Sequence, residues 1–161
     1  MGPNNTSNIW DMITISKTDA TNKDFIQLVE LLNADLAVKD GDQHGFYNQY
    51  NQINIIKYVL VAYSNGQAVA CGAIKEYEPG IMEVKRMFTL PAFQGKGIAT
   101  KVLSALENWA AELGNKKCIL ETGKRQPDAI HLYKKNGYQI IPNYGQYAGV
   151  DNSVCFEKQL L

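Results

Sequence analysis

Residues 87–99, with the sequence MFTLPAFQGKGIA, constrain the fold of this chain more than any other segment. They predict a strand that ends at Pro91, a short turn carrying Gly95 and Gly97, and a helix that begins directly afterwards. The glycines leave the backbone N–H groups of the turn uncovered, and the N–H groups of a first helical turn have no intrahelical partners. Because these donors converge at the positive end of the helix dipole, the segment predicts a site for a pyrophosphate group.

Two common nucleotide-binding loops do not fit this turn. A Walker-type loop needs G-x-x-x-x-G-K-[ST], which the run Gly95-Lys96-Gly97-Ile98 does not supply. A dinucleotide fingerprint needs G-x-G-x-x-G, but position 100 is Thr and no strand–helix–strand unit opens the chain. Two glycines between a strand and a helix can also form a plain tight turn. The amphipathic helix that follows favours the phosphate site.

The first half of the chain predicts antiparallel strands. A strand over residues 13–16 comes first, and an amphipathic helix follows, with candidate caps at residues 19–22, apolar residues over 25–36 and an end at residues 40–42. Three β-rich runs follow, separated by Asn65-Gly66 and by Glu78-Pro79-Gly80: residues 58–63, 68–74 and 81–90. Because such short turns join neighbouring antiparallel strands, the three runs predict a meander.

The second half predicts a parallel step. An apolar stripe over residues 99–113 predicts a helix that ends at Gly114, and a strand over 118–122 follows it. A strand, a helix and a strand in succession favour a right-handed parallel crossover. A helix beginning at Pro127 comes next, and then two last strands, over residues 138–141 and 153–157.

We therefore expect a mixed α/β fold with helices on both faces of a twisted sheet of about six to seven strands. Its N-terminal half is antiparallel and its parallel step lies at the centre. The length predicts a single domain over residues 1–161, with a loose polar tail over residues 1–8.

Composition argues against several classes of partner. The formal net charge is +0, so no basic excess favours nucleic acid. No apolar run reaches the roughly 20 residues of a membrane span, and the N-terminus lacks an apolar signal segment. Cys71, Cys118 and Cys155 lack metal-ligand spacing and are interpreted as buried thiols, with a catalytic cysteine as the alternative. We expect a cytoplasmic protein that binds no metal, nucleic acid or membrane.

Two motifs resemble those of a known superfamily. The run Gln94-Gly95-Lys96-Gly97-Ile98-Ala99 is similar to [RQ]-x-x-G-x-[GA], the acetyl-CoA motif of the GNAT superfamily of N-acetyltransferases. Residues 129–138, AIHLYKKNGY, are similar to the family's A-x-x-L-Y-x-x-x-G-[FY]. The motifs occur in the expected order, separated by a helix and a strand. The resemblance covers most of the chain and is strongest over residues 83–138. Ala99 stands where many members carry Gly, and Ala is a common alternative there.

The resemblance implies a GNAT fold with acetyl-CoA as the acyl donor and no metal. Backbone groups of residues 87–89 would pair with the pantetheine arm, and N–H groups of residues 95–100 would bind the pyrophosphate. Lys96 is either a charge contact or a solvated lysine, and Gln126 is either a cofactor contact or a helix N-cap. The expected acetyl-CoA-binding residues are Met87, Phe88, Thr89, Gln94, Gly95, Lys96, Gly97, Ile98, Ala99, Thr100, Gln126 and Tyr133.

Acyl transfer to an amine needs a base, because an ammonium group with a pKa of about 10.4 has no lone pair for attack. The resemblance implies two candidates. Glu83, the first choice, matches the base of the histone-acetylating branch, and Glu121 matches the base of the ribosomal-protein-acetylating branch. A relay through bulk water is the third alternative. A structural ion pair with Lys85, Arg86 or Lys124 is the alternative role for either carboxylate.

Tyr133 matches the family's general-acid tyrosine, which donates a proton to the departing thiolate. Its alternative role is that of a core aromatic. The expected function is an N-acetyltransferase that moves an acetyl group from acetyl-CoA to a primary amine by direct attack in a ternary complex. The alternative is a non-catalytic acyl-CoA-binding or sensing module on the same fold.

The acceptor and the oligomeric state stay open at this point, a homodimer being frequent in the family. In this family the two least regular regions shape the acceptor pocket. The aromatic residues in those regions line that pocket or pack in the core: Phe46, Tyr47, Tyr50, Tyr144 and Tyr147. Two lone histidines, His44 and His131, are interpreted as ordinary polar residues.

Overall fold

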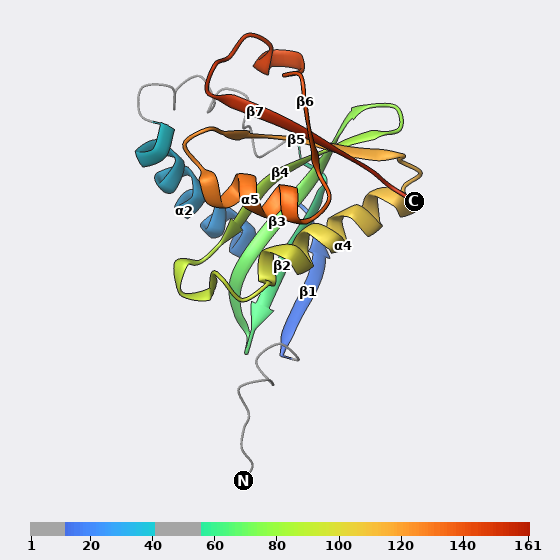
Figure 1. Cartoon of the computed structure of the whole chain (residues 1–161). Coiled ribbons are helices and arrows are strands. Elements are labelled where there is room, and N and C mark those ends of the chain that lie inside the picture. The colour runs from blue at the N-terminus through green and yellow to red at the C-terminus, as the bar shows by residue number, and fades with distance from the viewer. Residues whose placement is uncertain (1–11, 41–55) are drawn as a thin grey trace.

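A central sheet with the strand order β1-β2-β3-β4-β5-β7-β6 organises the computed structural model, which describes residues 12–40 and 56–161 (Figure 1). The strands are β1 (Ile13–Thr18), β2 (Tyr58–Ser64), β3 (Gln67–Glu78), β4 (Ile81–Thr89), β5 (Lys117–Gly123), β6 (Gln139–Ile141) and β7 (Ser153–Gln159). The helices are α2 (Lys23–Asp40), α4 (Ile98–Glu112) and α5 (Pro127–Lys135), with short 3-10 turns η3 (Pro91–Phe93) and η4 (Gly145–Tyr147).

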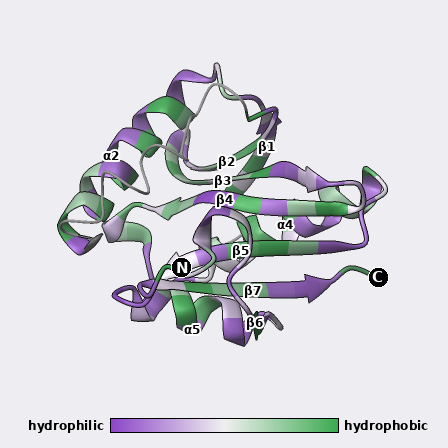
Figure 2. Cartoon of the chain, turned by 90° about the horizontal axis from the view of Figure 1, so that it is seen from above, coloured by the Kyte–Doolittle hydropathy of each residue, from purple (hydrophilic) through white to green (hydrophobic). Residues whose placement is uncertain are grey.

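Helix α2 covers one face of the sheet. Its N-terminus is capped by Asn22, whose Oδ1 accepts a 2.9 Å hydrogen bond from the Phe25 N–H group. From there its buried residues recur at helical spacing: Phe25, Leu28, Val29 and Leu32. The first three pack against one set of alternating strand residues, Val59, Val61, Cys71 and Ala73. Figure 2 shows the resulting alternation of hydrophobic and hydrophilic bands along α2.

Helix α4 covers the opposite face. Its apolar stripe packs on the strand residues that alternate with those under α2, including Leu60, Ala62 and Ile74. The helix approaches β3 closely at Gly72, where a Cβ atom would lie 2.6 Å from Met87 Sδ and 2.8 Å from Leu106 Cδ1. Period-two alternation along β2 and β3 thus gives the sheet two apolar faces, one for each helix.

The central strands β4 and β5 are parallel, and they separate after a short contact. Their paired residues run only from Ile81–Lys117 to Glu83–Ile119. Beyond that point β5 continues to pair with β7, and β4 continues to pair with β3. In the described part of the chain, the edge of β4 that faces β5 therefore has no strand partner over residues 84–89.

A bulge lies in β4 beside this separation. On β3, Cys71 and Ala73 are two residues apart, whereas their partners Phe88 and Lys85 are three apart. The extra residue is accommodated at Arg86, whose φ of 61° lies in the left-handed region. The bulge changes which side chains of β4 face the region between β4 and β5.

The predicted fold class, the antiparallel meander and the parallel step are all confirmed. The position of β7 between β5 and β6 was not predicted. The three cysteines are free and buried, as expected, and burial raises the pKa of Cys71 and Cys118 to about 12 and that of Cys155 to about 11. Among the described helices, none has the length and apolar character needed to cross a membrane. The tail over residues 1–8 and the residues His44, Phe46, Tyr47 and Tyr50 lie outside the described residues.

Candidate active site

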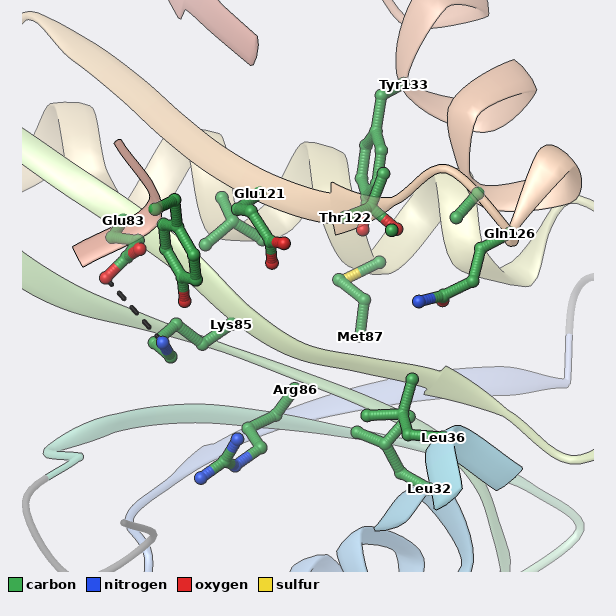
Figure 3. Close-up of a pocket in the computed structure, with 14 residues that line it drawn as sticks. Leu32, Leu36, Glu83, Lys85, Arg86, Met87, Glu121, Thr122, Gln126 and Tyr133 are labelled. Carbon is green, nitrogen blue, oxygen red and sulfur yellow. Dashed lines mark ion pairs between the residues drawn. The ribbon is translucent and has the colours of Figure 1, made fainter. Parts of the chain in front are cut away.

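A cleft opens where β4 and β5 separate, and side chains from α2, β4, β5, α5 and η4 line it (Figure 3). Five of the predicted site residues lie together here: Glu83, Met87, Glu121, Gln126 and Tyr133. They come from two strands and from the helix after β5, so the fold brings distant parts of the chain to one cavity. Leu32 and Leu36 of α2 form part of another wall, which the sequence analysis did not identify.

The glycine turn lies between the end of β4 and the start of α4. Gly95 and Gly97 have φ values of 75° and 81°, and Gly97 is the N-cap of α4. This left-handed conformation favours glycine at both positions. The backbone bond from the Lys101 N–H group to the Gly97 carbonyl, 3.1 Å long, begins the ladder of α4. The N–H groups of Ile98, Ala99 and Thr100 precede that bond, as expected for a helix N-terminus that can bind an anion.

Neighbouring side chains hold this turn in place. The Gln94 side-chain amide donates a 3.1 Å hydrogen bond to the carbonyl of Thr89, which ties the turn to the end of β4. The Asn136 amide donates to Thr100 Oγ1 at 3.3 Å, which ties α4 to the end of α5. The exposed Lys96 places its ammonium 5.6 Å from the centre of the Phe93 ring.

Phe88 and Gln126 differ in their surroundings. Phe88 packs with the α2 core and borders a second hollow, between α2 and the turn, together with Pro91 and Gln94. Gln126 lies at the N-cap position of α5, but its side chain makes no capping hydrogen bond and instead lines the main cleft. The alternative prediction, a side-chain cap, is therefore not what the structure shows.

The two candidate carboxylates have different partners. Glu83 is 5% exposed; its Oε2 accepts a 2.6 Å hydrogen bond from the Tyr144 hydroxyl, and its Oε1 lies 3.8 Å from Lys85 Nζ. Glu121, on β5, accepts a 2.7 Å hydrogen bond at Oε2 from the Ser153 hydroxyl. Glu83 thus forms the ion pair with Lys85 that was the alternative prediction for this residue. Both carboxylates remain on the wall of the cleft.

Tyr133 lies on α5 with its ring packed against Tyr138 and Phe156, at centroid distances of 5.8 and 5.9 Å. Burial, and then the charge of Glu121, raise the pKa of its hydroxyl above the usual value of about 10. The hydroxyl therefore stays protonated at neutral pH and can donate a proton. Tyr133 is thus packed in the core and also lies on the cleft wall.

Two buried cations complete the cleft. Lys85 and Arg86 are 9% and 6% exposed. Burial lowers the pKa of Lys85, which the charge of Glu83 partly opposes. Tyr147 of η4 lines the same cleft, and burial raises the pKa of its hydroxyl. The sequence analysis had considered Lys85 and Arg86 only as ion-pair partners, because strand alternation alone does not reveal the bulge that brings both to this cleft.

The described residues contain no group of three or more His, Cys, Asp or Glu side chains that could hold a metal ion. A strand edge, a helix N-terminus, two carboxylates and a protonated tyrosine therefore lie in one region of the fold.

Comparison with known proteins identifies the class. The sequence profile of the acetyltransferase (GNAT) family matches residues 25–138, and the chain belongs to this family. An IAA acetyltransferase of Azospirillum brasilense is 39% identical over 102 residues, which are 63% of this chain and 67% of that protein. The uncharacterized N-acetyltransferase YjgM of Escherichia coli is 36% identical over 107 residues, 65% of this chain and 63% of that protein. The chain thus matches about two thirds of the length of these relatives.

Solved structures extend the likeness to nearly the whole chain. A Klebsiella pneumoniae protein assigned as an acyl-CoA N-acyltransferase has a TM-score of 0.79 and 34% identity, covering 93% of this chain and 99% of that one. A GNAT family acetyltransferase from Elizabethkingia anophelis with acetyl-CoA bound has a TM-score of 0.69 and 20% identity, covering 93% and 99%. The second likeness is one of fold alone.

Proposed function

We propose that this protein is an N-acetyltransferase that moves an acetyl group from acetyl-CoA to a primary amine by direct attack in a ternary complex. The observation that carries the proposal is the early separation of β4 and β5. Within the described residues, it leaves one edge of β4 without a strand partner from the carboxylates to the glycine turn, and it opens the cleft that Tyr133 lines. The acetyl-CoA complex of a protein with the same fold also supports it.

The residues present fit coenzyme A. Backbone groups of Met87, Phe88 and Thr89 lie on the edge of β4 that no strand of residues 12–40 or 56–161 covers, so they are placed to pair with the amides of the pantetheine arm. The N–H groups of residues 95–100 would hold the pyrophosphate. Gln126, which lines the cleft without capping its helix, would contact the same ligand. Acetyl-CoA supplies the activated acyl group.

Two proton transfers accompany the acyl transfer. The neutral amine of the acceptor attacks the thioester carbonyl carbon, the new C–N bond forms and the C–S bond breaks. The amine proton passes to a carboxylate, and the departing thiolate takes a proton from the Tyr133 hydroxyl. The Tyr133 hydroxyl is protonated at neutral pH, and its raised pKa favours the return of a proton from solvent to the tyrosinate after the donation.

Glu83 is our first candidate for the base, and Glu121 is the second. Glu83 is the more deeply buried of the two, and the Tyr144 hydroxyl fixes its carboxylate in one orientation. Glu121 stands close enough to Tyr133 to influence its ionisation. A relay through bulk water is the remaining alternative for the base.

A panel of amines tests this function against the rival, a non-catalytic acyl-CoA-binding module. The protein is mixed with acetyl-CoA and with amino acids, polyamines, aminoglycosides and lysine peptides, and the release of free CoA is measured. Amine-dependent release above the rate of spontaneous hydrolysis supports the transferase. Tight binding of acetyl-CoA with no release for any amine supports the binding module.

A further inference from the structure

The cleft holds two cations that the proposed acetyl transfer does not use. Lys85 and Arg86 are both more than nine-tenths buried and both line the cavity. Charged side chains this deeply buried are rare, because removing a charge from water is costly unless a partner offsets it. A buried cation on the wall of an open cleft is placed to bind an anionic group of a ligand.

The bulge in β4 is what brings both cations to the cleft. Strand alternation would direct Lys85 and Arg86 to opposite faces of the sheet. The extra residue in β4 and the φ of 61° at Arg86 break this alternation, so both side chains line the cavity (Figure 3). A left-handed conformation at a non-glycine residue costs about 1–2 kcal/mol, and strained residues of this kind are enriched at functional sites.

Two acids and two bases lie on the wall of the cleft: Glu83, Glu121, Lys85 and Arg86. Lys85 Nζ lies 3.8 Å from Glu83 Oε1, and the charges of Arg86 and Glu121 also act on Lys85. A carboxylate that accepts the amine proton loses its negative charge. During the reaction, less negative charge then lies beside the two cations to offset their positive charge, unless the acceptor itself carries an anionic group next to them.

We propose that the acceptor is a small free amino acid, whose carboxylate binds between Lys85 and Arg86 while its amine faces the carboxylates of Glu83 and Glu121. This proposal rests on the N-acetyltransferase function proposed above. Because Lys85 lies directly beside Glu83, the amine and the anionic group of the acceptor are separated by few bonds, as in an α-amino acid.

The same geometry disfavours two other acceptor classes. A polyamine carries a second ammonium group, which would lie near Lys85 and Arg86 and be repelled by their positive charges. The amine of a lysine side chain in a protein carries no carboxylate near its nitrogen, so it would leave Lys85 and Arg86 without the anion that the cleft can hold. The cations therefore act as a specificity device as well as a binding site.

Matched acceptors test this proposal on the wild-type protein. CoA release is measured with standard L-amino acids, with the carboxamide of each, and with spermidine. We expect the best amino acid to exceed its own carboxamide by about tenfold or more in kcat/KM, as a charge-assisted contact implies. A carboxamide or spermidine that matches or exceeds every amino acid would overturn the proposal while leaving the acetyltransferase function intact.

Variants of the two cations test whether they cause the preference for an amino acid over its carboxamide. Lys85→Gln and Arg86→Gln should raise the KM for the amino acid by about tenfold and reduce the ratio between acid and amide toward one, with a smaller effect on kcat. Lys57→Gln is the matched control, because Lys57 is exposed and does not line the cleft. An unchanged ratio in both cleft variants would show that the carboxylate binds elsewhere.

A binding measurement keeps the test independent of turnover and of the stability of the variants. N-acetyl-L-amino acids, the products of the proposed reaction, and their carboxamides are titrated by calorimetry into the wild-type protein saturated with CoA. Tighter binding of the acids than of the amides supports the proposal. Equal binding, or no binding of any acid, would overturn it. Failure of the transferase function itself would instead appear as the absence of amine-dependent CoA release with every acceptor.

Discussion

The hydroxyl of Tyr144 donates a 2.6 Å hydrogen bond to Oε2 of Glu83. Tyr144 lies in the segment that joins β6 to β7. Glu83 lies in β4, which is separated from β7 by β5 in the sheet order. The rings of Tyr77 and Tyr147 meet the Tyr144 ring nearly edge-on, at 5.2 and 5.6 Å, and hold it in place. The proposed base therefore depends on a segment far from it in the sequence.

Removing this hydroxyl should weaken catalysis without weakening acetyl-CoA binding. In Tyr144→Phe the carboxylate of Glu83 loses the donor that orients it, so we expect kcat to fall by about tenfold, the equivalent of one modest hydrogen bond. Tyr77→Phe is the control, because Tyr77 packs on the same ring and is 39% exposed. Equal kcat values for Tyr144→Phe and the wild type would show that the bond does not serve the reaction.

Replacing each carboxylate separately identifies the base. We expect Glu83→Gln to lower kcat by about 100-fold, the usual contribution of a positioned base, and Glu121→Gln to have a smaller effect. Glu76→Gln, an exposed position on β3, controls for the loss of a charge. A larger loss of kcat in Glu121→Gln than in Glu83→Gln would assign the base to Glu121. Near-wild-type kcat in both cleft variants would favour the water relay.

Tyr133→Phe separates proton donation from packing. The ring and its contacts with Tyr138 and Phe156 are kept, so the fold and the affinity for acetyl-CoA should be retained. Because the thiolate would lose its proton donor, kcat should fall by about 100-fold. Tyr138→Phe is the matched control, since Tyr138 is buried against the same ring and does not line the cleft. If the two variants have the same kcat as the wild type, Tyr133 is a packing residue only.

Alkaline pH should destabilise the fold. Burial raises the pKa of four tyrosines, Tyr133, Tyr138, Tyr144 and Tyr147, above their usual value. Below pH of about 10 their hydroxyls are protonated in both states and the contribution to stability is complete. At higher pH the unfolded chain ionises first, so the free energy of unfolding falls by up to about 1.4 kcal/mol per pH unit for each tyrosine.

Lys85 has the opposite effect on the free energy of unfolding. Because burial lowers its pKa, its ammonium group destabilises the folded state at lower pH, and this destabilisation disappears as pH rises toward 10.5. The four tyrosines outnumber it. Urea unfolding at pH of about 9 and about 11 should therefore show a lower midpoint at the higher pH, and Tyr144→Phe should reduce that difference. An unchanged midpoint, or ionisation of these tyrosines in the folded protein near pH 10, would contradict the burial that the structure describes.

Much of this fold follows from local patterns. The two-residue turn at Asn65-Gly66 and the period-two alternation beside it specify the antiparallel strands β2 and β3. The apolar stripe of α4 specifies the helix that crosses between β4 and β5. The glycine turn could be recognised because Gly95 and Gly97 must adopt conformations that other residues avoid.

The remaining features depend on long-range packing. Nothing near Ser153 indicates that β7 inserts between β5 and β6, because strand order is decided by which edges remain open. The bulge at Arg86 could not be predicted from local sequence either, because the residue in the left-handed conformation is not a glycine. For the same reason the sequence suggested Glu83 and Tyr144 as separate candidates but could not predict the hydrogen bond between them.

A calorimetric titration with acetyl-CoA, comparing two glycine variants, tests the central claim most directly. Gly97 and Gly114 both have positive φ, 81° and 91°, both have open space where a Cβ would lie, and they flank the two ends of α4. Glutamate at either position should therefore strain the backbone equally. We predict that Gly97→Glu abolishes binding, because it places negative charge at the pyrophosphate, and that Gly114→Glu binds like the wild type. Retained affinity in Gly97→Glu, or absence of binding in the wild type, would contradict the account.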